Sequence, residues 1–186
     1  MEYESRKDDL ELLKRIEKGD NDAVTELYNT YVDRLYTLIF NQVDRDRETA
    51  QEILQETFFA AVRSARKFRG KSKLYTWLCA IANKKVADYY RHKKRETSQR
   101  VSYAVESNGI QDTKEDVIAI IESKESGRAI RNILFSMPLH YRQVLLLKYV
   151  EKLPVSEISE VMERSPKSVE GLLTRARKEF QAKISE

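Results

Sequence analysis

The helical spacing of apolar residues is the feature that most constrains how this chain can fold. Apolar side chains recur every three or four positions along most of the 186 residues, and five glycines and three prolines leave few places where a helix must end. A period of 3.6 residues places such side chains on one face of a helix. No stretch shows the two-residue alternation of a strand. The sequence therefore predicts an all-α protein.

The periodic segments fall into two groups. Four predicted helices lie within residues 1–95, and polar residues then interrupt the helical period from about 92 to 112. The period resumes near Thr113 and continues to the end of the chain. Each group is long enough for one small domain. We therefore expect two helical domains, at 1–95 and 126–186, joined by a flexible acidic linker at 96–125.

Charge is segregated along the chain. Residues 1–62 carry a net charge of −7, residues 63–95 carry +11, residues 96–127 carry −4 and residues 128–186 carry +4. Basic segments attract phosphates, whereas an acidic segment favours a basic protein partner. The distribution indicates one protein-binding surface and two surfaces for nucleic acid.

The basic segment 63–95 holds twelve Lys or Arg residues and a single acid, Asp88. Five aromatic residues lie among these charges, and cations with flat aromatic faces are what single-stranded nucleic acid requires of a protein. The alternative is a solvated basic helix face above an ordinary aromatic core. Trp77 falls within the apolar stripe of its predicted helix, which favours a place in the core over a stacking role. The aromatic residues are Phe68, Tyr75, Trp77, Tyr89 and Tyr90.

The last third of the chain has the pattern of a helix-turn-helix. A short predicted helix ends near Met162, and Ser165 and Pro166 then supply the cap and first residue of a second helix. In such a motif the second helix reads base edges while flanking cations hold phosphates. An ordinary helical hairpin with a charged outer face is the alternative. The residues predicted on the outer face are Lys167, Ser168, Glu170, Thr174, Arg175, Arg177 and Lys178.

Three motifs in this order resemble the extracytoplasmic-function group of bacterial sigma factors, the two-domain initiation subunits of RNA polymerase. The run from Gln51 to Phe58 is similar to the helix that docks on the polymerase clamp. The run from Phe68 to Leu78, followed by Ile81-Ala82-Asn83 and Asp88-Tyr89-Tyr90-Arg91, resembles the segment that melts and reads the −10 element. The segment from Met137 to Leu145, with Glu157-Ile158 and Arg175-Ala176-Arg177-Lys178, resembles the domain that reads the −35 element.

The resemblance implies a factor that binds core RNA polymerase and promoter DNA, as duplex at −35 and as a single strand at −10. It also implies an anti-sigma factor as partner, often membrane-anchored in this group. The implied polymerase-binding residues are Glu52, Ile53, Gln55 and Glu56. The implied −10 residues are Trp77, Asn83, Lys84, Lys85, Tyr89 and Arg91. The implied −35 residues are the seven outer-face residues of the second helix in the helix-turn-helix.

Two other classes of protein remain to be weighed. A helix-turn-helix regulator that acts without joining polymerase would explain the C-terminal motif. It would not explain the acidic residues 1–62 or the basic segment 63–95. An enzyme is not expected, because His92 and His140 show no metal-ligand spacing and there is no glycine-rich phosphate loop. We expect no cofactor, metal or small-molecule substrate. Without a signal sequence or a long apolar run, the chain is expected to be cytoplasmic.

Overall fold

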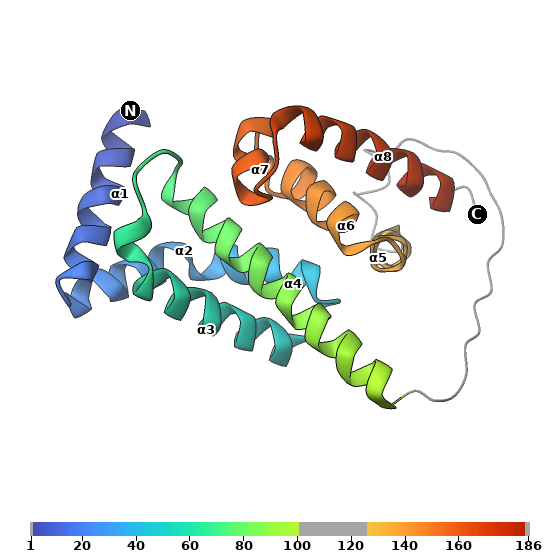
Figure 1. Cartoon of the computed structure of the whole chain (residues 1–186), viewed down its shortest axis with the longest axis horizontal. Coiled ribbons are helices and arrows are strands. Elements are labelled where there is room, and N and C mark those ends of the chain that lie inside the picture. Colours follow the sequence, from blue (N-terminus) through green and yellow to red (C-terminus); the bar gives the residue numbers. More distant parts are fainter. Residues whose placement is uncertain (1, 101–125, 185–186) are drawn as a thin grey trace.

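The computed structural model describes residues 2–100 and 126–184, and these residues contain helices and connecting turns without any strand. The all-α prediction is therefore confirmed for the described part of the chain. Residues 101–125, most of the predicted linker, lie outside the described residues. The elements are α1 (Glu2–Glu17), α2 (Asn21–Gln42), α3 (Arg47–Arg63), the 3₁₀ turn η1 (Ala65–Lys67), α4 (Leu74–Arg100), α5 (Ser126–Ser136), α6 (Leu139–Leu145), the π-helical turn η3 (Leu146–Val150), α7 (Val155–Val161) and α8 (Pro166–Ile184) (Figure 1).

Local capping explains the end of α1 and the starts of α2 and α3. Gly19 follows α1 with a φ of +84°, a conformation that glycine adopts without strain. Asp20 then caps α2, with its Oδ1 accepting from the backbone N–H groups of Asp22 and Ala23 at 2.9 and 3.1 Å. Asp46 caps α3 in the same way. These bonds satisfy N–H groups that have no partner within the helix.

A distant residue caps the start of α4. The backbone N–H of Leu74 donates to the Oδ2 atom of Asp9, which lies in α1, at 3.1 Å. Gly70 makes the turn before α4 with a φ of +64°, and a Cβ at this position would lie 2.8 Å from Leu10. The helix continues to Arg100, past the end of its apolar period, because the Lys- and Arg-rich residues after 90 favour helix.

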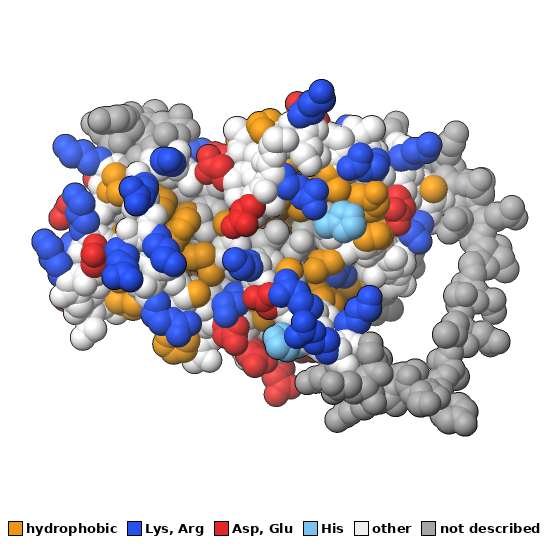
Figure 2. All heavy atoms as spheres, in the orientation of Figure 1, with side chains coloured by type: hydrophobic (Ala, Val, Ile, Leu, Met, Phe, Trp, Pro, Cys, Tyr) orange, Lys and Arg blue, Asp and Glu red, His pale blue; other side chains and the backbone are white. Residues whose placement is uncertain are grey.

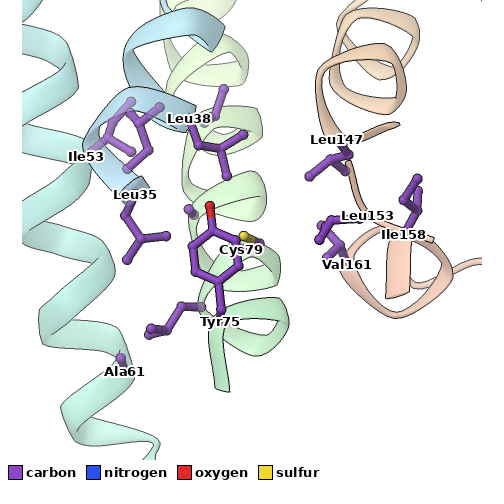
Figure 3. Close-up of a cluster of buried hydrophobic side chains, with 14 of the residues drawn as sticks. Leu35, Leu38, Ile53, Ala61, Tyr75, Cys79, Leu147, Leu153, Ile158 and Val161 are labelled. Carbon is purple, nitrogen blue, oxygen red and sulfur yellow. The ribbon is translucent and has the colours of Figure 1, made fainter. Parts of the chain in front are cut away.

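The buried side chains form one cluster, to which both the N-terminal and the C-terminal helices contribute (Figure 3). Leu35 and Leu38 of α2, Ile53 of α3 and Cys79 of α4 belong to the part of it at the N-terminal helices. Across from them, the C-terminal helices bury the set Leu147, Leu153, Ile158, Val161 and Leu172. Burial raises the pKa of the Cys79 thiol to about 12.

The N-terminal and C-terminal helices pack directly on each other. Helix α4 lies between the two sets, with α7 against it (Figure 1). Hydrogen bonds cross the boundary from Tyr75 to Glu151 at 2.6 Å and from Thr76 to Glu157 at 2.7 Å. We call this boundary the junction. It consists of Arg34, Gln42, Lys73, Tyr75, Thr76, Asn83 and Tyr90 on the N-terminal side, and Arg142, Gln143, Glu151 and Glu157 on the C-terminal side.

Candidate nucleic-acid and protein interfaces

The basic residues of α4 lie largely on its solvent-facing side. Lys84 and Arg91 are exposed, and Arg91 forms an ion pair with Asp88 at 2.9 Å. Lys85 is half-buried and its Nζ lies 2.9 Å from the Oε2 atom of Glu56 in α3. Exposed ion pairs contribute little stability, so a phosphate can replace either carboxylate at low cost. Figure 2 shows Lys and Arg side chains distributed along the face on which α4 runs.

The aromatic residues of the basic segment divide between core and surface. Phe68 and Tyr75 are buried, which removes both from a nucleic-acid surface in this conformation. Trp77 is half-buried and packs against Phe68 with ring centroids 5.4 Å apart, so its ring belongs in part to the core. Tyr89 is half-buried beside Tyr90, with centroids 5.2 Å apart in an edge-to-face arrangement. Trp77 and Tyr89 are therefore the two predicted −10 aromatic residues, and each exposes part of its ring.

Asn83 lies elsewhere than the helical wheel of α4 predicts. On that wheel Asn83 falls away from the apolar stripe, as the −10 role implied by the resemblance requires, but only 7% of the residue is exposed. The Nε2 atom of Gln143, in α6, donates to the backbone carbonyl of Asn83 at 3.1 Å, and the Oδ1 atom of Asn83 is buried without a hydrogen-bond partner. The prediction of an open Asn83 is wrong for this conformation. A helical wheel describes one helix and cannot include a second domain that covers it.

One face of α3 is exposed, with a composition suited to a protein partner. Glu52, Gln55 and Glu56 are exposed along it, as expected. Ile53 is 3% exposed and belongs to the core, so its side chain takes no part in this exposed face, and its contact with polymerase stays a prediction. Phe59 was not among the expected residues, yet 59% of it is exposed on the same face. The adjacent pair Phe58-Phe59 was the available signal, because successive helical residues point about 100° apart and only one can enter the core.

The second helix of the C-terminal motif presents the expected outer face. Ser165 caps α8, with its Oγ accepting from the N–H of Ser168 at 3.2 Å. The turn before it contains no glycine, and Glu163 takes the left-handed conformation with a φ of +51°. Thr174 donates to the carbonyl oxygen of Glu170 at 2.9 Å, and Arg177 donates to the Thr174 hydroxyl at 3.4 Å. The exposed residues are Lys167, Glu170, Thr174, Arg175, Arg177 and Lys178, with Ser168 partly buried.

His140 lies near two arginines of this motif. Partial burial lowers the pKa of His140, and the nearby Arg164 and Arg175 lower it further, although Glu179 opposes them. The neutral form of His140 is therefore favoured.

Comparisons with known proteins agree with this geometry. Residues 27–96 match the family model described as Sigma-70 region 2, and residues 127–180 match that described as Sigma-70, region 4. The chain is 28% identical over 178 residues to the ECF RNA polymerase sigma factor SigW of Bacillus subtilis, covering 92% of this chain and 94% of the relative. It is 27% identical over 184 residues to the ECF RNA polymerase sigma-E factor of Haemophilus influenzae, covering 95% of each.

The chain belongs to the extracytoplasmic-function group of the sigma-70 family. Solved structures share its fold. The sigma factor RpoE of Bartonella quintana, in complex with the anti-sigma factor NepR, aligns with a TM-score of 0.66 at 15% identity, over 86% of this chain and 95% of the other. CnrH, in complex with the cytosolic domain of CnrY, aligns with a TM-score of 0.64 at 21% identity, over 92% and 94% of the two chains.

This sigma factor binds core RNA polymerase and recognises promoters, and its candidate residues fall within the matched regions. The α3 and α4 residues lie in region 2, and the α8 residues lie in region 4. In the part of the sigma factor that the structure describes, no helix is both long and apolar enough to cross a membrane. Within that same part, His, Cys, Asp and Glu side chains do not gather in groups of three suited to a metal ion.

Proposed function

We propose that this sigma factor divides promoter recognition among three exposed helix faces. The acidic face of α3 docks on core polymerase, the basic face of α4 holds the melted −10 strand, and the outer face of α8 reads the −35 duplex. One observation carries the proposal: three faces of different chemistry lie on three helices, in the order of the two regions that the family models match.

The polymerase-docking face combines charge with one apolar residue. Glu52, Gln55 and Glu56 present acidic and polar groups to a basic partner, which aids orientation and the rate of encounter. Phe59 lies one helical turn further along the same face. Covering the exposed Phe59 ring with a partner would remove apolar surface from water, and this burial would stabilise the complex. We therefore assign the orienting role to the charges and the main affinity to Phe59.

The −10 face uses cations for the backbone and polar or aromatic groups for the bases. Lys84, Lys85 and Arg91 hold phosphates, and the Glu56 and Asp88 carboxylates that now pair with two of them are exchanged for DNA. Asn83 hydrogen-bonds a base edge once α6 moves off it. Trp77 and Tyr89 offer the exposed parts of their rings to unstacked bases.

The −35 face divides its residues along α8. Lys167, Ser168, Glu170 and Thr174 occupy its first turns and approach base edges, as expected for the second helix of this motif. The cations Arg175, Arg177 and Lys178 follow and anchor the phosphate backbone. Base preference therefore depends on the first set, and salt-dependent affinity depends on the second.

The remaining proposals concern the whole chain. We assign residues 1–95 and 126–186 to two domains and 96–125 to an acidic linker, acting in the cytoplasm without catalysis, cofactor or small-molecule substrate. An anti-sigma factor, membrane-anchored or not, is proposed as the regulator. Of the proteins that share this fold, the sigma factor RpoE was solved with the anti-sigma factor NepR, and CnrH was solved with the cytosolic domain of CnrY.

The experiment that tests the function has two steps. Genome-wide mapping of transcription start sites after overexpression identifies promoters that depend on this chain. Run-off transcription from one of them, with purified core polymerase, must then require the protein. Specific binding to duplex DNA without any initiation would contradict the proposal and favour a regulator that does not join polymerase.

A further inference from the structure

The junction between the two halves contains a buried carboxylate that belongs to one half and is bound by the other. The Glu151 side chain, 5% exposed, accepts a hydrogen bond of 2.6 Å from the Tyr75 hydroxyl. The Arg34 Nε atom donates to the same carboxylate oxygen at 3.2 Å. The Arg34 guanidinium also lies 3.7 Å from the centre of the Tyr75 ring. Charge-assisted bonds of this kind are stronger than neutral ones, so Glu151 fastens the C-terminal half to α2 and α4.

A second carboxylate makes a similar contact at the start of α4. The Glu157 Oε2 atom accepts from the Thr76 hydroxyl at 2.7 Å, and its Oε1 atom lies 3.0 Å from the Lys73 Nζ atom. Thr76 is 1% exposed, so α7 covers this part of α4. Two carboxylates of the C-terminal half therefore occupy part of the basic segment that the proposed function gives to DNA.

The part of the junction around Gln143 contains buried polar atoms without hydrogen-bond partners. Gln143 donates both to the Asn83 carbonyl at 3.1 Å and to the Oε1 atom of Gln42 at 3.2 Å. Three buried side-chain atoms in the described residues nevertheless lack a hydrogen-bond partner: Gln42 Nε2, Asn83 Oδ1 and Arg142 Nε. All three belong to the junction. Buried polar groups without partners oppose association, which is the property expected of a contact that must separate.

We propose that the junction is an autoinhibitory clasp. In the closed form the C-terminal half covers Thr76 and Asn83, and the Glu151 and Glu157 carboxylates contact α4. Opening frees this face of α4 for the −10 strand. The unpaired Oδ1 of Asn83 is then available to a base. The clasp itself rests only on the contacts of the junction, while its effect on DNA rests on the −10 role proposed for α4.

The two contacts suggest a charge-swap experiment. Glu157→Lys places a cation beside Lys73 and should open the clasp, and Lys73→Glu combined with Glu157→Lys should restore it. Glu160→Lys is the matched control, because Glu160 is exposed on the same helix and undergoes the same change of charge. Glu151→Gln, which removes the ionic part of the other contact, provides a second opening variant should Glu157→Lys fold poorly.

The position of the two halves can be measured by double electron–electron resonance in the full chain. Spin labels at Asn29→Cys and Ala182→Cys are exposed on opposite halves, and Cys79 stays unlabelled because it is buried with a raised thiol pKa. We expect one short distance in the free protein and a shift of the closed-to-open ratio by about tenfold in Glu157→Lys or Glu151→Gln. The double swap should return the short distance, and Glu160→Lys should keep it.

A broad distance distribution in the free wild-type chain, or no response to either opening variant, would overturn the clasp. Affinity for a fluorescein-labelled oligothymidine of roughly 20 nucleotides tests its consequence. Binding should rise about tenfold more for Glu157→Lys than for Glu160→Lys, since both add the same charge. If the distances respond while binding of the oligonucleotide does not, the clasp stands and the −10 role of this face is wrong.

Discussion

Replacing Phe59 by alanine should weaken binding to core polymerase about tenfold. Burying a Phe side chain removes roughly 200 Å² from water, and a residue that is 59% exposed has about 120 Å² of this left to bury. At about 25 cal/mol per Å² complete coverage would contribute about 3 kcal/mol. A partner that covers one side of the ring would recover about half of this, which corresponds to the tenfold change.

The assay is a titration of fluorescently labelled sigma factor with core polymerase. Phe59→Leu is the matched control, because it keeps most of the apolar area and should bind nearly as well as the native chain. Glu56→Gln should act differently: its effect should fade between about 0.1 and 1 M salt, where screening of exposed charges increases steeply. The loss from Phe59→Ala should persist over the same range, because apolar burial does not depend on screening.

Folding must be separated from binding in this series. Phe59 is mostly exposed, so the circular dichroism spectrum and melting temperature of Phe59→Ala should stay close to those of the native chain. Native-like affinity of a folded Phe59→Ala, alongside a clear loss from Glu56→Gln, would refute the reasoning that apolar area supplies the affinity. A loss of binding by Phe59→Leu as large as that of the alanine variant would point to shape instead of area.

Three further predictions concern stability and the −35 face. Gly70→Ala should lower the free energy of unfolding by about 1–2 kcal/mol in urea titrations, because alanine is strained at this positive φ and its Cβ would press on Leu10; an unchanged midpoint would contradict this. Hydrogen bonds from the Thr49 hydroxyl and from the backbone N–H groups at the start of α3 lower the pKa of Asp46, so its contribution to stability should be complete above the ordinary pKa of about 3.9 and lost as the pH falls through the lower folded value. Melting curves should therefore show Asp46→Ala less stable than wild type at neutral pH, with the difference disappearing in acid. Arg177→Ala should weaken binding to every −35 sequence and flatten the salt slope by about one unit, whereas Glu170→Ala should change base preference; the reverse assignment in fluorescence anisotropy would exclude the division proposed for α8.

Local sequence signals predicted much of the fold because they act within a few residues. Gly19 and Asp20 mark the boundary between α1 and α2, and Ser165-Pro166 marks the start of α8. The start of α4 carries no such signal, because its capping carboxylate, Asp9, is contributed by α1. The sequence pattern likewise predicted the exposed acids of α3 but included Ile53, since the motif it resembles does not separate core from surface positions.

The sequence by itself determined the helical class, the order of acidic and basic segments and the family, because periodicity, capping and motif spacing are properties of the chain alone. Only the tertiary structure decided which residues are accessible. It buried Asn83 beneath α6, left Phe59 rather than Phe58 in solvent, and brought Glu151 to Arg34 and Tyr75. The physical reason is that burial depends on what packs against a helix, and the C-terminal residues that hydrogen-bond to α4 lie 60 or more positions away along the chain.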